Sequence, residues 1–183
     1  MIVGSVDPKT DKVYLAADRG VFLDDTHEIS PNPKIIKKKI GKGAYIVIGN
    51  AGDFKPLNLI SYWNTNFFKY DPEKMVPEEF LIKRFVPEMK KLFDKNDYKK
   101  EKDFNFLIGI SGEIFEINDS YEVIKPDQSC ATVGSAGDAA KAALYCMNLL
   151  KIKKSTKVKL TIAVTVACNV SNWAKGTIDI LGV

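Results

Sequence analysis

The sequence has no apolar run long enough to cross a bilayer, although hydrophobic residues make up 45% of its 183 positions. The opening residues Met1-Ile2-Val3 are followed by Gly, Ser and Asp, without the basic and extended apolar regions of a signal peptide. We therefore expect a cytoplasmic protein that binds no membrane.

Cysteine and histidine are scarce. The three cysteines, Cys130, Cys146 and Cys168, are widely spaced in apolar segments and form no Cys-x-x-Cys pair, which is typical of buried reduced thiols. The single histidine, His27, lies in a polar stretch without companion ligands, so we expect it at the surface. We expect neither a metal site nor a cofactor.

Arginine is also rare, and lysine supplies almost all of the cations behind the net charge of +4. The run Lys37-Lys38-Lys39 could contact phosphates, but no aromatic or arginine side chain interleaves it in the sequence. The modest charge favours solubility rather than binding of nucleic acid.

The length suits one domain, residues 1–183. Two short apolar runs at 1–6 and 13–18 flank a polar turn cluster and predict a β-hairpin that ends on Asp18, directly after two alanines. A polar loop over 24–28 and strands at 34–40 and 44–48 should follow, so that four strands precede the first helix.

Helical spacing predicts a first helix from about residue 53 to 70 and a second from 77 to 93, kinked or divided at Pro87. Strands are predicted at 104–110, 113–117, 121–124, 131–133 and 177–181, and a third helix begins at 134–137. Residues 160–170 fit either a strand, by propensity, or a buried helix, by spacing. This order indicates an α+β architecture of two facing sheets, each covered outside by helices.

Four stretches resemble the proteasome β subunits and the bacterial HslV protease. Residues 13–18 are similar to the V-x-L-A-A-D of that family, and 48–52 to its glycine-bearing strand end. Residues 132–137, with the alanines after them, resemble the opening of its third helix, and 167–171 more weakly resemble the loop after its last helix. The resemblance implies the N-terminal nucleophile (Ntn) hydrolase fold, a four-layer αββα sandwich, in which 160–170 is a helix.

The resemblance also implies a set of site residues. In that family the hydroxyl of an N-terminal threonine is the nucleophile and its α-amine the general base. Carried over by position, the family aspartate is Asp18, its lysine is Lys34, Lys37 or Lys38, its two serines are Ser135 and Ser171, and its oxyanion amide is that of Gly52. We favour Lys34 because it keeps the family's interval between aspartate and lysine. The aspartate that usually accompanies the second serine falls on Cys168.

The nucleophile itself is missing. Setting Ile2-Val3-Gly4 on the family's first strand puts Met1 at the second family position, so the place of the threonine lies ahead of Met1. Each carried-over residue also has a purely structural interpretation: Asp18 as a buried ion pair, Ser135 as a helix N-cap and the glycines as turns.

We therefore expect a subunit that forms stacked homo-oligomeric rings and is structural or non-catalytic, with an ATPase unfoldase as a partner that the resemblance allows. The alternative is an active threonine-type endopeptidase or amidase acting on polypeptides, whose nucleophile is exposed by processing, or one that uses Ser5 after cleavage at Gly4-Ser5. A third interpretation is an unrelated α+β binding protein.

Overall fold

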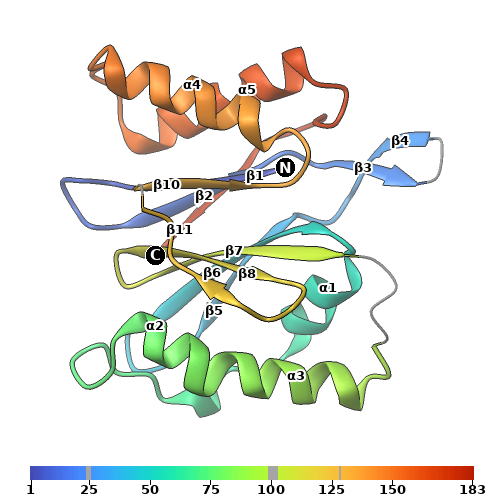
Figure 1. Cartoon of the computed structure of the whole chain (residues 1–183), viewed down its shortest axis with the longest axis vertical. Helices are drawn as coiled ribbons and strands as arrows, with labels where there is room; N and C mark the ends of the chain where they lie inside the picture. Colours follow the sequence, from blue (N-terminus) through green and yellow to red (C-terminus); the bar gives the residue numbers. More distant parts are fainter. Residues whose placement is uncertain (24–25, 99–102, 128) are drawn as a thin grey trace.

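The chain folds into four layers in a computed structural model that describes residues 1–23, 26–98, 103–127 and 129–183. Two antiparallel sheets face each other in the middle, and helices cover the outer face of each sheet (Figure 1). A separate two-stranded sheet stands beside these layers. The α+β, four-layer αββα sandwich expected from the sequence is confirmed.

The first sheet is built around the N-terminal hairpin. Its four antiparallel strands lie in the order β10-β1-β2-β11: β1 (Ile2–Val6), β2 (Val13–Ala17), β10 (Cys130–Val133) and β11 (Asp179–Gly182). Ile2 pairs with Ala17, and the Asp7 amide closes the turn by donating to the Lys12 carbonyl at 2.8 Å. The predicted hairpin is confirmed, and its register returns the first residue to the end of β2.

The second sheet has the order β5-β6-β7-β8-β9: β5 (Ile35–Lys39), β6 (Tyr45–Gly52), β7 (Phe104–Ile110), β8 (Glu113–Asn118) and β9 (Val123–Ile124). The sequence predicts that β6 ends at Ile48, but pairing with β7 continues to Gly52. At Gly52 φ is +91°, and a side chain would collide with the Asp103 carbonyl. The glycine therefore lets two backbones approach closely instead of breaking the strand.

The structure corrects the polar loop predicted over residues 24–28. β3 (Gly20–Leu23) and β4 (Thr26–Ile29) form a hairpin of their own, so six strands precede the first helix. Residues 24–25 lie outside the described residues. Because β4 pairs only with β3 and is mostly exposed, its polar composition hides the strand from the sequence pattern.

The first helix is shorter than predicted. α1 (Lys55–Tyr62) stops where Trp63 takes an extended backbone, φ −68° and ψ 129°, and a short 3-10 turn, η1 (Asn66–Phe68), follows. The Trp63 ring packs edge-on against Phe68, with ring centroids 5.2 Å apart. Packing of aromatic rings across the loop thus overrides the helical spacing that continues in the sequence.

The second predicted helix is continuous across Pro87. It consists of α2 (Pro77–Phe80), a π-helical turn, η2 (Leu81–Phe85), and α3 (Val86–Lys95). Proline has no N–H to donate to the carbonyl four residues earlier, and its ring crowds that carbonyl. The wider π turn just before Pro87 accommodates both effects without ending the helix.

The last two helices cover the first sheet. α4 (Gly137–Leu149) starts with Ala136 as N-cap, and α5 (Thr156–Val170) starts at Ser155, whose hydroxyl accepts from the Val158 amide. Residues 160–170 belong to α5, so the helix implied by the resemblance is confirmed and the alternative strand is wrong. In the described parts of the chain, no helix has the length and apolar character required to span a membrane.

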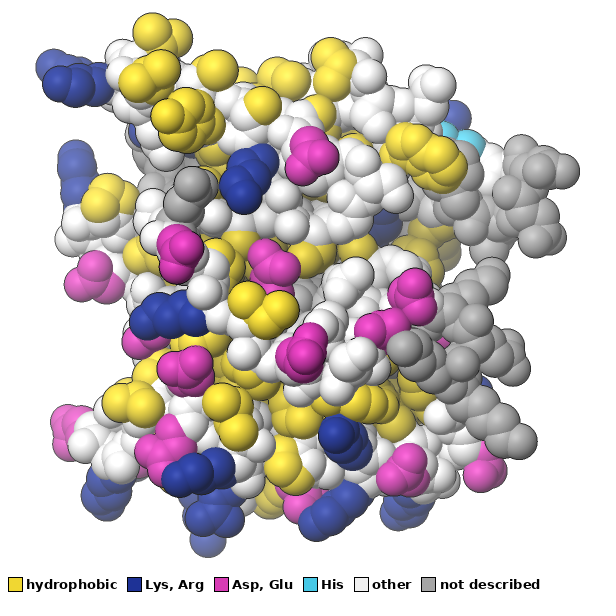
Figure 2. Space-filling model, viewed as in Figure 1, with side chains coloured by type: hydrophobic (Ala, Val, Ile, Leu, Met, Phe, Trp, Pro, Cys, Tyr) yellow, Lys and Arg dark blue, Asp and Glu magenta, His cyan; other side chains and the backbone are white. Residues whose placement is uncertain are grey.

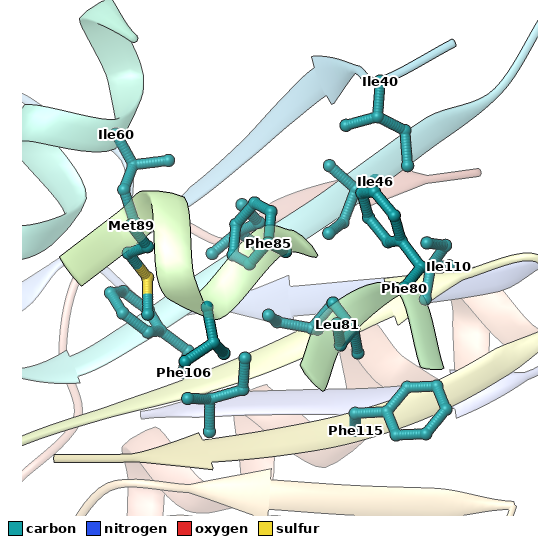
Figure 3. Close-up of a cluster of buried hydrophobic side chains, with 14 of the residues drawn as sticks. Ile40, Ile46, Ile60, Phe80, Leu81, Phe85, Met89, Phe106, Ile110 and Phe115 are labelled. Carbon is teal, nitrogen blue, oxygen red and sulfur yellow. The ribbon is translucent and has the colours of Figure 1, made fainter. Parts of the chain in front are cut away.

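Buried apolar residues form three clusters that match the three spaces between layers. One lies between the sheets, one between the first sheet and α4 and α5, and the largest between the second sheet and α1 to α3. Figure 3 shows the largest, in which Phe80, Leu81, Phe85 and Met89 from the helices meet strand residues such as Phe106. The layers therefore hold the N-terminal hairpin rigidly from both faces.

Candidate functional site

The carboxylate of Asp18 is completely buried, directly after β2. Its Oδ1 accepts hydrogen bonds from the α-amine of Met1 at 2.7 Å and from Nζ of Lys34 at 2.9 Å. Its Oδ2 accepts from the backbone amides of Gly20 at 2.8 Å and Lys175 at 3.0 Å. The lysine ammonium, the N-terminal amine and two backbone amides thus satisfy a charge that is removed from water.

Three segments bring these groups together. The small side chains of Ala16 and Ala17 let β2 pack closely, and the hairpin register carries Met1 to Asp18. Lys34 stands just before β5, and its carbonyl accepts from the Asn50 amide of β6 at 2.9 Å. The two sheets therefore each supply one side of the ion pair.

The α-amine of Met1 is a weak base in this setting. Burial, and then the positive charge of Lys34, lower its pKa from 8.0 to about 6, although Asp18 opposes the shift. At pH 7 the amine is therefore mostly neutral and donates an N–H to Asp18. The persistent ion pair is the one between Asp18 and Lys34.

Asp18 itself remains ionised. Burial alone would raise the pKa of its carboxyl group, but the charges of the Met1 amine and Lys34, with the hydrogen bonds it accepts, hold the pKa below its ordinary value. The site thus combines a carboxylate, an ammonium and a neutral amine within hydrogen-bonding distance.

His27 also approaches this site, which the sequence did not predict. A side-chain carbon at position 20 would lie 2.7 Å from His27 Nε2 and 2.9 Å from Asp18 Oδ2, so both atoms flank Gly20. Burial, followed by the charge of Lys175, lowers the pKa of His27. His27 is half-buried and not fully at the surface as expected, because the pairing of β4 with β3 brings it beside Gly20. Nothing in the local sequence signals this contact.

Gly134 closes the site over Met1. A side-chain carbon there would lie 3.2 Å from Met1 Cα and 3.0 Å from the Ala51 side chain, and φ is +93°. Only 4% of Met1 is exposed. The segment before α4 therefore needs a glycine both for its backbone and for its contact with the first residue.

The remaining carried-over residues lie around this centre without contacting Asp18. Ser135 is exposed, and it is not the helix N-cap, which is Ala136. Ser171 follows α5, and its hydroxyl accepts from the Trp173 amide at 3.1 Å. Gly52 ends β6 next to Ala51. The catalytic roles of these residues stay predictions.

The charges of Asp18, Lys34 and the Met1 amine also affect the thiol of Cys168, which lies in the last turn of α5. Burial and the nearby Asp18 raise the pKa of its thiol, and the Met1 amine and Lys34 only partly offset this. The thiol is therefore protonated at neutral pH, which disfavours it as a nucleophile.

Among the three lysines left open by the sequence, Lys34 is the one whose ammonium contacts Asp18. Nζ of Lys37 donates to the Gly182 carbonyl at 2.9 Å, and Nζ of Lys38 donates to the Ser61 carbonyl at 2.8 Å. Both lysines are thus engaged elsewhere on β5.

The position of Met1 differs from the expectation that the nucleophile's place lies ahead of it. Ile2 pairs with Ala17, so Met1 itself stands beside Asp18. The site can hold and transfer a proton at the α-amine, but Met1 brings neither a hydroxyl nor a thiol. Among the described residues, no group of three or more His, Cys, Asp or Glu side chains could hold a metal ion.

No family model matches the sequence, and no curated protein matches it either. Solved structures do. Eukaryotic HslV from Trypanosoma brucei is 21% identical with a TM-score of 0.68, over 100% of this chain and 98% of that one. Thiobacillus denitrificans BPH in complex with epoxomicin is 15% identical with a TM-score of 0.71, over 100% and 98%. The helical assembly of the Anbu complex from Pseudomonas aeruginosa is 12% identical with a TM-score of 0.64, over 100% and 80%.

These comparisons show the fold. The chain has the fold of the proteasome-type Ntn hydrolases, as its resemblance implied.

Proposed function

We propose that the protein is a proteasome-type subunit that assembles with copies of itself and lacks a catalytic nucleophile. One observation carries the proposal: the residue beside the Asp18–Lys34 pair is Met1, whose side chain cannot attack a carbonyl. The carboxylate, the ammonium and the neutral α-amine are retained as a buried structural cluster. A role in building an assembly needs the fold and this cluster, but no chemistry at residue 1.

The position of Ser5 argues against its being a nucleophile exposed by processing. It lies within β1, where it pairs with Tyr14 of β2 and with Cys130 of β10. Cleavage before Ser5 would remove Ile2 and Val3, which are fully buried, and with them most of the pairing of the central hairpin. The new first residue, Ser5, would then lie four positions along the chain from Met1, the residue that contacts Asp18.

Exposed apolar side chains over α4 and α5 support assembly. Figure 2 shows hydrophobic side chains gathered on the helical layer at the top of the view. On α4 the exposed fractions of Tyr145 and Leu149 are 60% and 68%, and that of Leu150 just after it is 71%. On α5, Val158 and Ile162 are 41% and 39% exposed. Apolar groups gathered in this way mark surfaces that bind other proteins.

Restoring the nucleophile tests the catalytic half of the proposal. Met1→Thr, expressed behind an additional initiator methionine that an aminopeptidase removes, would place a hydroxyl beside the α-amine and Lys34. We expect this variant to react with a peptide epoxyketone and the wild type to remain unmodified. Met1→Ala, prepared in the same way, is the matched control and should not react. Labelling of the wild type would contradict the proposal.

Sedimentation velocity tests the assembly half. The wild type should sediment as an oligomer at micromolar concentration, and Leu149→Glu with Leu150→Glu should shift it toward the monomer. Lys95→Glu with Arg84→Glu, which alters exposed sites on η2 and α3 in the opposite helical layer, is the control and should leave the oligomer intact. A wild type that stays monomeric at high concentration would contradict assembly.

A further inference from the structure

A basic cavity lies away from Asp18, beside the end of the sandwich where the N-terminal hairpin turns. Its volume is about 650 Å³, within the range of about 300–1,000 Å³ typical of small-molecule sites. Its wall combines the turn before β2, strand β5, the start of β6, the first turn of α5 and the last residues of β11. The residues with charged or aromatic side chains in this wall are Lys12, Tyr14, Lys37, Lys42, Tyr45 and Lys157.

Among the residues that the structure describes, the four lysines of this cavity have no acidic partner. All four side chains belong to exposed residues, and in the described chain none of them forms an ion pair with a carboxylate. The described lining contains no Asp or Glu side chain, so only the α-carboxylate of Val183 offsets the lysines there. Like charges in one concave site repel one another and raise the local concentration of anions.

Contacts with tyrosines hold two of the lysines in place. Nζ of Lys157 lies over the Tyr14 ring, 5.2 Å from its centroid, and Nζ of Lys37 lies over the Tyr45 ring at 4.7 Å. Lys37 also donates to the Gly182 carbonyl, which ties β5 to β11. These contacts orient cationic side chains toward a common space and reduce the entropy lost when they bind a ligand.

The fold brings aromatic side chains close to the lysine run on β5, although none interleaves that run in the sequence. Tyr14 comes from the facing sheet and Tyr45 from the neighbouring strand. Lysine binds phosphate as a compact point charge with several donors. The limited volume of the cavity, about 650 Å³, favours a small ligand over a nucleic acid chain. We propose that this cavity binds a small anion carrying two or more phosphate groups.

Isothermal titration calorimetry of the full chain with tripolyphosphate, and separately with adenosine triphosphate, tests the proposal. We expect saturable binding that weakens as salt rises from 50 to 200 mM. Lys42→Gln with Lys157→Gln should lower the affinity at least tenfold. Lys95→Gln with Lys153→Gln removes the same charge from exposed sites elsewhere and should change the affinity less than twofold.

The two ligands identify the source of the phosphates. Equal affinity for both would assign the cavity to the phosphate chain alone. Tighter binding of the nucleotide, reduced by Tyr45→Leu, would assign it to a nucleotide; either result supports the proposal. The absence of saturable binding for both ligands, or equal weakening in both lysine pairs, would overturn it. Because the cavity does not include Met1 or Asp18, these outcomes are independent of the proposed function.

Discussion

The ammonium of Lys34 lies 2.9 Å from the carboxylate of Asp18, and both side chains are almost completely buried. The two residues come from facing sheets, so their contact depends on how the sheets pack as well as on either strand alone. The contact between Lys34 and Asp18 keeps an ion pair in the protein interior, directly beside Met1.

Asp18→Asn should destabilise the protein by about 3–5 kcal/mol, because it leaves the Lys34 ammonium buried without a counter-charge. Urea unfolding measures this change. Glu79→Gln is the matched control, since it breaks the exposed pair with Lys83 and should cost less than about 0.5 kcal/mol. Similar losses of unfolding free energy in the two variants would show that the buried ion pair contributes no more to stability than the exposed one.

Lys34→Met should raise the pKa of the Met1 α-amine from about 6 toward 8.0, because the charge of Lys34 is the second largest cause of its depression. The pH dependence of the Met1 Cα chemical shift measures this pKa. In Lys37→Met, which removes a charge engaged with Gly182, the value should stay near 6. An amine that titrates at about 6 in Lys34→Met would refute the assigned cause.

Stability should rise between pH 6 and 8. In that window the unfolded chain, with an α-amine pKa near 8.0, binds more protons than the folded chain, whose amine has a pKa of about 6. The free energy of unfolding should therefore increase by about 2–3 kcal/mol across the window and level off above it. Urea titrations at half-unit pH steps measure the slope.

His27→Asn separates the two groups that titrate near neutrality. The pKa of His27 is lowered from 6.5, so any change in stability that His27 causes should occur at pH values below 6.5. The rise between pH 7 and 8 should persist in this variant if the α-amine is responsible. Its disappearance would assign the effect to His27 instead.

Gly134→Ala should destabilise the protein more than Gly43→Ala does. Both glycines have positive φ, +93° and +73°, so both alanines strain the backbone. At Gly43 the new carbon meets open space, whereas at Gly134 it presses on Met1 and Ala51. The difference, about 1–3 kcal/mol by thermal or urea unfolding, measures the contact over Met1. Equal losses of stability in the two variants would mean that Met1 and Ala51 move aside without cost.

The sequence predicted most of the sandwich because its strands and helices carry strong periodicity. The N-terminal hairpin, the β7–β8 hairpin and the second-half helices follow from local patterns and family motifs. The β3–β4 hairpin escaped prediction because β4 is mostly polar and exposed and, among the described strands, pairs with β3 alone. The end of α1 was missed because packing of Trp63 against other aromatic rings, and not a local signal, stops the helix.

At the candidate site, Asp18 and Lys34 could be placed from the interval that the family motif fixes. Met1 could not, because its position depends on the pairing register of the N-terminal hairpin, which matching residue types on the first strand does not fix. His27 comes beside Gly20 through the pairing of β4 with β3, which leaves no periodic trace in the sequence. The basic cavity likewise brings together residues separated by most of the chain, such as Lys12 and Lys157.

The intact mass of the purified protein, before and after incubation with a peptide epoxyketone, tests the central claim most directly. We expect a chain that retains Met1 and a mass that the reagent does not change. A chain that begins at Ser5, or an adduct of one reagent per chain that competes with a peptide substrate, would contradict it.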